Sequence, residues 1–388
     1  MTDSARATNA DVANRAAAAF RPSEVIRIGA ELEWLVYRTS DSRQAVSASE
    51  TAAVATGRLP AGGSITVEPG GQLELATLPA SGPAALLEAI DTDARVLVER
   101  FAAHDLALVP IGLDPIRPAR RTLEVARYEA MERHFAAVSP AGLEMMNRTA
   151  SLQLNIDFGP DPAATWRRAH ALAPLLSAAF ANSPTTDGAA FAPVSHRQQI
   201  WTATDPSRTR PVGATPDSWH RYILDAHVIP RSDTGPAAGA PPRPRSFAAW
   251  LDSAAPPTTH DLDTHITTLF PPLRPRGYLE LRMLDALPRT GRAAAIATVW
   301  ALLADPDAGV AVDQHATDPT DVWRVATTLG LADSTTRAAG AQLLRIAAAH
   351  LGPTQPQLGD ACDLWREHVE AGTTATSIAE LLSTTETP

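Results

Sequence analysis

The chain has 388 residues, 45% of them hydrophobic, which is enough to bury a sizeable core in one large domain or two. Its formal charge of −10 argues against a nucleic-acid partner, because contact with the phosphate backbone needs clustered positive charge. All 33 basic residues are arginine, and the absence of lysine excludes a P-loop lysine, a kinase-type strand lysine and a Schiff base.

The first residues, 1–23, predict a polar lead followed by a short helix. No stretch approaches the roughly eighteen apolar residues of a membrane span, so we expect neither export nor membrane insertion. Cys362 is the only cysteine, which excludes an intrachain disulfide and a cysteine-rich zinc site. Together these features predict a protein of the reducing cytoplasm.

Strict alternation of polar and apolar residues begins in the stretch 29–34. A period of two predicts a strand, with Glu31 and Glu33 on one face and Leu32 and Trp34 on the other. Charged side chains therefore share a strand with core residues.

A second alternating stretch follows at residues 64–75. Two short strands, 64–67 and 72–75, are joined through Pro69-Gly70-Gly71, which is a strong turn signal. We expect a hairpin that carries Gln72 and Glu74 on one face.

A helix is predicted next, with Ser81 as its cap and Pro83 in its first turn. Its apolar residues recur at helical spacing, so it should cover the apolar face of the sheet. Residues 106–111 predict a strand, and the loop 112–121 after it carries three arginines and two prolines. Such a stiff basic loop suits an anionic ligand.

The middle of the chain carries the longest alternation, residues 151–158, between helices predicted near 128–135 and 166–180. Its amides Gln153 and Asn155 face the same way and suit a ligand with both donors and acceptors, although solvated amides fit equally well.

The last alternating strand, residues 278–283, places Glu280 and Arg282 on one face. Arg282 could hold a phosphoryl group or a carboxylate, or pair with Glu280 within the strand. Before it, residues 231–246 predict a mobile loop or lid. After it, residues 292–350 are rich in alanine and leucine and predict helices.

If these strands share one sheet, four carboxylates gather on its polar face: Glu31, Glu33, Glu74 and Glu280. Half-buried carboxylates are costly unless cations neutralise them, and oxygen ligands without cysteine favour Mg²⁺. The alternative is an antiparallel sheet whose polar face meets water, and the pattern alone leaves the two interpretations open.

Eight stretches in chain order carry a resemblance to a known family: IGAELEW, VEPGGQLEL, GLDPIRPARR, RYEAMERHF, MMNRTASLQLNIDFG, AFANSP, RQQIWTATDPSRT and HITTLFPPLRPRGYLELRMLDA. They span about residues 28–290. The chain resembles the glutamate-cysteine ligases of the plant-like and actinobacterial group, above all the branch that opens ergothioneine biosynthesis.

The resemblance implies an α+β, glutamine-synthetase-like fold, in which a curved antiparallel sheet forms a funnel-shaped active site and helices pack outside it. It implies a single catalytic domain over residues 1–388, with a core of about 24–290 and a helical part of about 291–370. It also implies a reaction in which ATP phosphorylates the γ-carboxylate of glutamate and the amine of cysteine displaces phosphate, giving γ-glutamylcysteine.

Roles for single residues follow from the resemblance alone. Metal ligands would be Glu31, Glu33, Glu74 and Glu280, holding Mg²⁺ against the phosphates of ATP. Arg282 would contact phosphate or the acyl phosphate, and Glu280, Arg282 and Glu31 would be the catalytic residues. Substrate and ATP contacts would come from Glu33, Gln72, Arg127, Tyr128, Arg148, Gln153, Asn155 and Arg197.

Two alternatives stay open at this stage. A related ligase could join glutamate to a different amine with the same carboxylates, or a homologue could bind the ligands without catalysis. The second would be expected to lack one of the acidic or arginine positions, and none of the four strands does.

Overall fold

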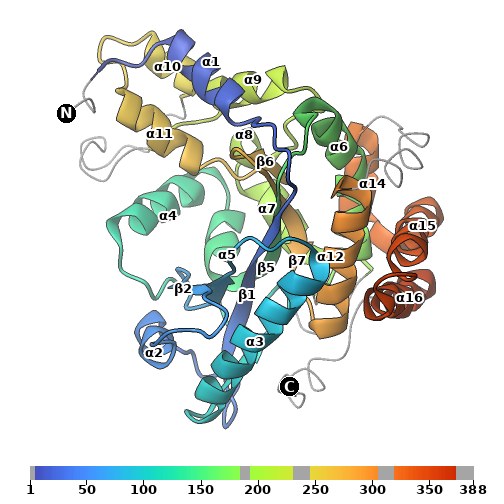
Figure 1. Cartoon of the computed structure of the whole chain (residues 1–388). Helices are drawn as coiled ribbons and strands as arrows, with labels where there is room; N and C mark the ends of the chain where they lie inside the picture. Colours follow the sequence, from blue (N-terminus) through green and yellow to red (C-terminus); the bar gives the residue numbers. More distant parts are fainter. Residues whose placement is uncertain (1–4, 184–192, 230–244, 305–318, 373–388) are drawn as a thin grey trace.

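The computed structural model describes residues 5–183, 193–229, 245–304 and 319–372, which form an antiparallel sheet surrounded by helices (Figure 1). Six strands lie side by side in the order β2-β3-β1-β5-β7-β6, and a seventh, β4, also pairs with β1. Their bounds are β1 Ile28–Arg38, β2 Ser64–Val67, β3 Leu73–Ala76, β4 Leu106–Val109, β5 Ser151–Ile156, β6 Leu273–Pro275 and β7 Leu279–Asp285. The α+β fold with an antiparallel sheet is as expected.

The strand register brings the alternating polar residues together. Glu33 pairs with Glu74 between β1 and β3, and Glu31 pairs with Gln153 between β1 and β5. At the far side of the sheet, Glu280 on β7 lies between partners on β5 and β6. Because side chains alternate along each strand, these residues share one face.

The opposite face of the sheet is buried by helices (Figure 1). α3 (Pro83–Ala102) packs against β1 and β4, α6 (Pro162–Ala179) against β6 and β7, and α12 (Arg289–Ala304) against β5. A further layer lies outside them: α14 (Pro319–Thr328), the 3-10 turn η1 (Gly330–Ala332), α15 (Ser334–Leu351) and α16 (Pro356–Ala371). Fully buried residues such as Trp34, Leu73 and Leu154 fill the core between sheet and helices.

Shorter helices stand on the polar side of the sheet, at the left of Figure 1, or frame its ends. α4 (Ala126–Val138) packs on α5 (Ala141–Arg148), and α5 packs on α7 (His196–Thr204), which also contacts β7. The remaining helices are α1 Asn9–Ala18, α2 Ala48–Val54, α8 Pro206–Thr209, α9 Asp217–Asp225, α10 Phe247–Leu251 and α11 Thr259–Thr267. Helices thus flank the polar face of the sheet.

Most expected elements are present, with small differences at their ends. The prediction that Ser81 caps α3 is wrong, because the N-cap residue is Gly82, which has no side chain to form a capping hydrogen bond. Pro83 occupies the first turn of α3, as expected. The loop expected at 231–246 lies almost entirely outside the described residues. Among the described helices, none is both long and apolar enough to cross a membrane.

Candidate active site

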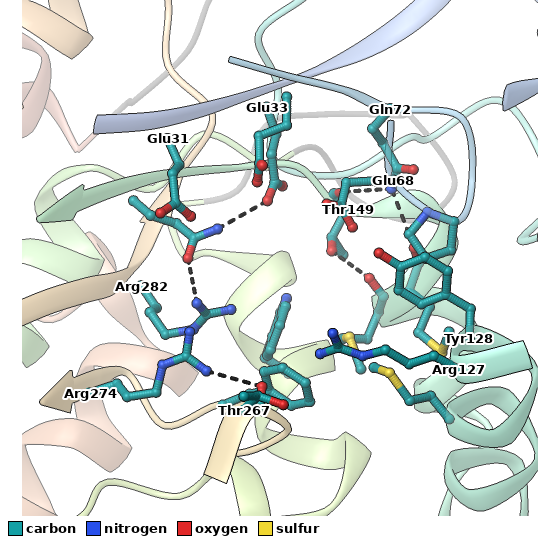
Figure 2. A pocket seen from close by; sticks show the side chains of 18 of the residues that line it. Glu31, Glu33, Glu68, Gln72, Arg127, Tyr128, Thr149, Thr267, Arg274 and Arg282 are labelled. Carbon is teal, nitrogen blue, oxygen red and sulfur yellow. Dashed lines mark hydrogen bonds between the residues drawn. The ribbon is translucent and has the colours of Figure 1, made fainter. Parts of the chain in front are cut away.

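A cavity of about 400 Å³ lies on the polar face of the sheet (Figure 2). This volume is within the usual range of small-molecule sites. In Figure 2, Glu31 and Glu33 lie above Arg282 and Arg274, while Arg127 and Tyr128 stand on the other side. The lining consists of Glu31, Glu33, Glu68, Pro69, Gln72, Glu74, Arg127, Tyr128, Met131, Met145, Met146, Thr149, Gln153, Trp201, Ile266, Thr267, Phe270, Arg274, Arg276 and Arg282.

Four glutamates line one part of the cavity, and we call them the acidic group. Glu31 and Glu33 come from β1, Glu74 from β3, and Glu68 from the turn that joins β2 to β3. Glu33 and Glu74 lie directly opposite each other on neighbouring strands, and two like charges at such positions destabilise the pairing of the strands. The fold therefore brings four carboxyl groups together, although strand pairing gains no stability from their proximity.

Within the described parts of the chain, none of the four carboxylates forms a salt bridge, and those of Glu31, Glu33 and Glu74 accept hydrogen bonds from neutral donors. The hydrogen bonds run to Glu33 from Ser151 N (2.8 Å) and Gln153 Nε2 (3.1 Å), to Glu31 from Asn155 Nδ2 (3.1 Å), and to Glu74 from Thr66 Oγ1 (2.6 Å). These donors orient the carboxylates without cancelling their charge.

Burial and mutual repulsion favour the protonated forms in this group. Burial, together with the charges of Glu33 and Glu74, raises the pKa of Glu68 to about 8. Burial and the charge of Glu33 likewise raise the pKa of Glu74 to about 7. The pKa of Glu33 is raised by burial, against the attraction of Arg197. A bound cation would stabilise the ionised carboxylates.

Three arginines surround Glu280 at the other part of the cavity, and we call Arg274, Arg276 and Arg282 the arginine group. Arg274 donates from Nε to Oε2 and from Nη2 to Oε1 (2.9 Å) of Glu280. The Nη1 atoms of Arg282 and Arg276 reach Oε1 at 3.1 and 3.4 Å. Burial opposes ionisation of Glu280, but Arg274 and Arg282 hold its pKa at about 2. One buried carboxylate thus gathers three cations at the cavity.

Arg282 joins the two groups. Its Nη1 donates to Gln153 Oε1 as well as to Glu280, and Gln153 in turn donates to Glu33. Figure 2 shows Arg282 and Glu33 at the two ends of the part of this path that lines the cavity. A continuous path of hydrogen bonds therefore runs from the acidic group to the arginine group across the floor of the cavity.

Most of the residues predicted from the sequence do line the cavity. Besides the glutamates of β1 and β3, these are Gln72, Arg127, Tyr128, Gln153 and Arg282. The Gln72 amide is also a brace, because its Nε2 donates to Thr149 O at 2.9 Å and its Oε1 accepts from Gly70 N at 3.0 Å. Burial and the charge of Glu68 raise the pKa of Tyr128.

Four predicted residues lie outside the lining. Glu280 is fully buried beneath the arginine group, and Asn155 holds Glu31 from β5. Arg148 is turned away, since it binds Asp114 O and the Glu144 carboxylate. The fourth, Arg197, is buried between α7 and β7, where its Nη2 donates to Arg282 O at 3.0 Å. A direct substrate contact by Arg148 or Arg197 therefore has no support in this geometry.

The structure also identifies lining residues that the sequence did not suggest. Glu68 lies in the turn between β2 and β3. The proline and glycines beside it suffice to predict that turn, and Glu68 is not part of an alternating pattern, so nothing in the sequence indicated a role for it. Arg274 lies on a strand of three residues among prolines, too short to show a period. The apolar wall includes Met131 and Met145, from helices whose sequence predicts core packing, and Phe270, from the loop between α11 and β6. Only tertiary structure reveals these positions.

The acidic group offers the hard carboxylate oxygens that Mg²⁺ prefers, and a bound cation would offset the mutual repulsion that raises the pKa values of Glu68 and Glu74. Within the described ranges, however, no three histidine, cysteine, aspartate or glutamate side chains are already placed around a common metal position. Glu280 in particular has its oxygens engaged by arginines. Binding of a metal would therefore need side-chain rearrangement in the acidic group.

Comparison with known proteins relates most of the chain to one family. The family model described as glutamate-cysteine ligase family 2 matches residues 27–352. The chain is 40% identical over 340 residues to glutamate-cysteine ligase EgtA of Mycolicibacterium smegmatis, covering 83% of this chain and 79% of that protein. It is 37% identical to EgtA of Mycobacterium tuberculosis, covering 89% and 83%. A chloroplastic glutamate-cysteine ligase of Medicago truncatula is 32% identical, covering 58% of this chain and 47% of that protein.

Solved structures share the fold at low sequence identity. The glutamate-cysteine ligase of Francisella tularensis in complex with AMP superposes with a TM-score of 0.57 at 13% identity, covering 93% of this chain and 85% of that one. A bifunctional glutathione synthetase from Pasteurella multocida gives 0.54 at 13% identity, covering 96% and 51%. At such identity the likeness concerns the arrangement of strands and helices.

Proposed function

The chain belongs to glutamate-cysteine ligase family 2 and is a ligase, and we propose that it joins the γ-carboxylate of glutamate to the amine of cysteine with cleavage of ATP. In the proposed reaction a γ-carboxylate oxygen attacks the γ-phosphorus of ATP and ADP leaves. The cysteine nitrogen then attacks the acyl carbon of γ-glutamyl phosphate, and phosphate leaves.

The observation that carries this proposal is the division of one cavity into an acidic and an arginine group joined by Arg282. Phosphoryl transfer needs little covalent chemistry from the protein and much neutralisation of charge. The arginine group supplies positive charge for the phosphoryl oxygens, and the acidic group offers oxygen ligands to a metal. A solvated sheet face would not need a buried carboxylate that organises three arginines.

Residue roles follow from position. Arg282 and Arg274 contact the transferring phosphoryl group, and Glu280 keeps both side chains directed at the cavity. Arg127 and Tyr128, on α4, stand where they can hold a substrate carboxylate. Such contacts act by fixing reacting groups in line, which supplies much of the rate in reactions of this kind.

Glu31, Glu33 and Glu74, with Glu68 beside them, are the residues that would hold Mg²⁺. When bound, Mg²⁺ neutralises phosphate charge and favours departure of ADP. A ligand role for Glu280 stays a prediction, because its oxygens would first have to exchange an arginine hydrogen bond for the metal. A structure of the same fold contains AMP, which supports a nucleotide as substrate.

We place the reaction at the first step of ergothioneine biosynthesis, in the cytoplasm, because the similarity to EgtA extends over most of both chains. A second candidate is a ligase that joins glutamate to another amine, since the charged residues described above do not themselves recognise a thiol.

A competition assay distinguishes these candidates. ADP release is followed with ATP, Mg²⁺ and glutamate while cysteine and other amino acids are offered singly and in mixture, and products are identified by mass. We expect cysteine to give the highest kcat/KM and γ-glutamylcysteine as product. Turnover with another amine and none with cysteine would establish the second candidate instead.

A further inference from the structure

Ion pairing alone does not fix the direction of the Arg282 side chain. Oε1 of Glu280 is shared by Arg274, Arg276 and Arg282. Among the described residues, both side-chain hydrogen bonds of Arg282 leave from Nη1, and its buried Nε has no partner. An arginine held at one nitrogen can pivot, so another contact must set the plane of its guanidinium.

Two aromatic rings supply that contact. The Cζ atom of Arg282 lies 5.6 Å from the ring centroid of Trp201 and 5.6 Å from that of Phe270. The two rings meet edge to face, with centroids 5.8 Å apart and an angle of 77°. A guanidinium within about 6 Å of an aromatic face is attracted by its quadrupole, and more strongly where water is excluded. Both rings also line the cavity.

The Trp201 ring is itself fixed to the strand that carries Arg282. Trp201 lies on α7 one turn after Arg197, whose Cζ is 5.4 Å from the indole centroid. Arg197 donates to Arg282 O at 3.0 Å and lies 3.9 Å from the carboxylate of Asp285. The buried Nε1 of Trp201 has no partner in the described parts of the chain, so stacking and packing hold the indole.

Helix α7 is docked on β7 at a second point. Asp285, fully buried at the end of β7, accepts a hydrogen bond from Oγ of Ser195, the residue that caps α7. On the other side, Phe270 is tied to α8 by a bond from its N to Arg208 O at 2.9 Å. Both rings therefore stand on anchored backbone.

We propose that Trp201 and Phe270 are positioning residues that clamp the Arg282 guanidinium in its phosphate-binding direction, with Arg197 holding the clamp on β7. The inference rests on the proposed function, because the clamp affects catalysis only if Arg282 binds the transferring phosphoryl group. It also assigns Arg197 a different task from the substrate contact expected from the sequence.

The test compares Trp201→Leu and Trp201→Phe by steady-state ADP release. Loss of the ring face should lower kcat about tenfold with little change in the KM for glutamate and cysteine, whereas Trp201→Phe should retain most of the activity. Trp250→Leu is the matched control, because it deletes another indole that stacks on an arginine, Arg245 at 4.8 Å, outside the cavity. That control should keep its kcat.

A second background separates positioning from general damage. In Arg282→Lys, which cannot present a planar guanidinium, adding Trp201→Leu should reduce the residual kcat by less than about twofold. The clamp would be overturned if Trp201→Leu lowered kcat in the Arg282→Lys background by the same factor as in the wild-type chain. It would also be overturned if Trp201→Leu alone left kcat unchanged. If Trp201→Leu does not fold, Phe270→Leu removes the other ring and carries the same expectations. Failure of the wild-type chain to ligate glutamate and cysteine would instead overturn the proposed function.

Discussion

At the scale of single residues, the site depends on how one buried carboxylate and three arginines share charge. Glu280 is inaccessible to solvent, while the arginine group around it lines the cavity. Removing a partner from a buried pair leaves a charge without compensation, and the cost depends on which partner is lost. Substitutions of Arg282 and of Glu280 should therefore differ in kind.

Arg282→Ala should abolish ligation and leave the protein folded. Two arginines still neutralise Glu280 in this variant, so we expect only a small change in thermal stability. Glu280→Gln should also abolish ligation, but it leaves three cations around a neutral amide and should cost about 3 kcal/mol or more of stability. ADP release and thermal unfolding measure both effects, and wild-type turnover in Arg282→Ala would refute the assignment.

The acidic group should give the metal-free protein an unusual pH dependence. The pKa values of Glu68 and Glu74, about 8 and 7, are raised from an ordinary value near 4.5, so the folded chain keeps protons that the unfolded chain has lost. Stability must fall as pH rises through that window. Burial lowers the pKa of His170 and His265 to about 3, which opposes this trend only below about pH 6.5.

We therefore expect the melting temperature in the presence of a chelator to fall between pH 6.5 and 8, and Mg²⁺ to raise it more at pH 8 than at pH 6.5. Glu68→Gln is the matched variant, and it should flatten the slope because it removes the group with the highest pKa. A melting temperature that is constant or rises over this range without metal would contradict the described charge arrangement.

At the scale of elements, the β2-β3 hairpin shows how backbone packing places a functional residue. Its turn carries Glu68 into the cavity, and Gly70 in the same turn packs against α5, where an added Cβ would lie 2.3 Å from Asn147 O. That contact is with backbone and cannot be relieved by a rotamer change. The hairpin can approach α5 only because the residue is glycine.

Gly70→Ala should therefore displace the hairpin, with a loss of about 1–3 kcal/mol of stability and a marked fall in activity. Gly82→Ala is a suitable control, because its nearest neighbour, a Trp300 ring atom, is 3.8 Å from the added Cβ. Thermal unfolding and ADP release should separate the two variants. Equal behaviour of both would mean that the hairpin does not need this close approach.

Strands were predictable where alternation ran for several residues, as in β1 and β5, because one face of each is core and the other is site. The hairpin was predictable from Pro69-Gly70-Gly71. The three-residue strand β6 was not, since it is too short for a period, and Arg274 was missed with it. The helix caps also depended on tertiary context, as Ser81 and Gly82 show.

At the scale of the whole molecule, function arises from bringing together strands that are distant in the sequence. β1 and β7 lie on either side of β5, so Glu33 and Glu280 end up on one face although about 250 residues separate them. Alternation predicts which residues face the same way, but not which helix covers them. The resemblance, and not alternation, placed Arg148 and Arg197 at the substrate, and a shared motif fixes the location of a residue better than its role. In the structure both side chains donate to backbone instead, Arg148 to Asp114 O and Arg197 to Arg282 O on β7.

If this cavity couples ATP cleavage to activation of the glutamate γ-carboxylate, an oxygen atom of that carboxylate must appear in the released phosphate, and isotope transfer measures this. With glutamate labelled by ¹⁸O in its γ-carboxylate, and with cysteine and unlabelled ATP, one labelled oxygen should pass into phosphate in each turnover, because the acyl C–O bond breaks when the amine attacks. Phosphate released without label while γ-glutamylcysteine accumulates would contradict the acyl phosphate and the role assigned to the arginine group.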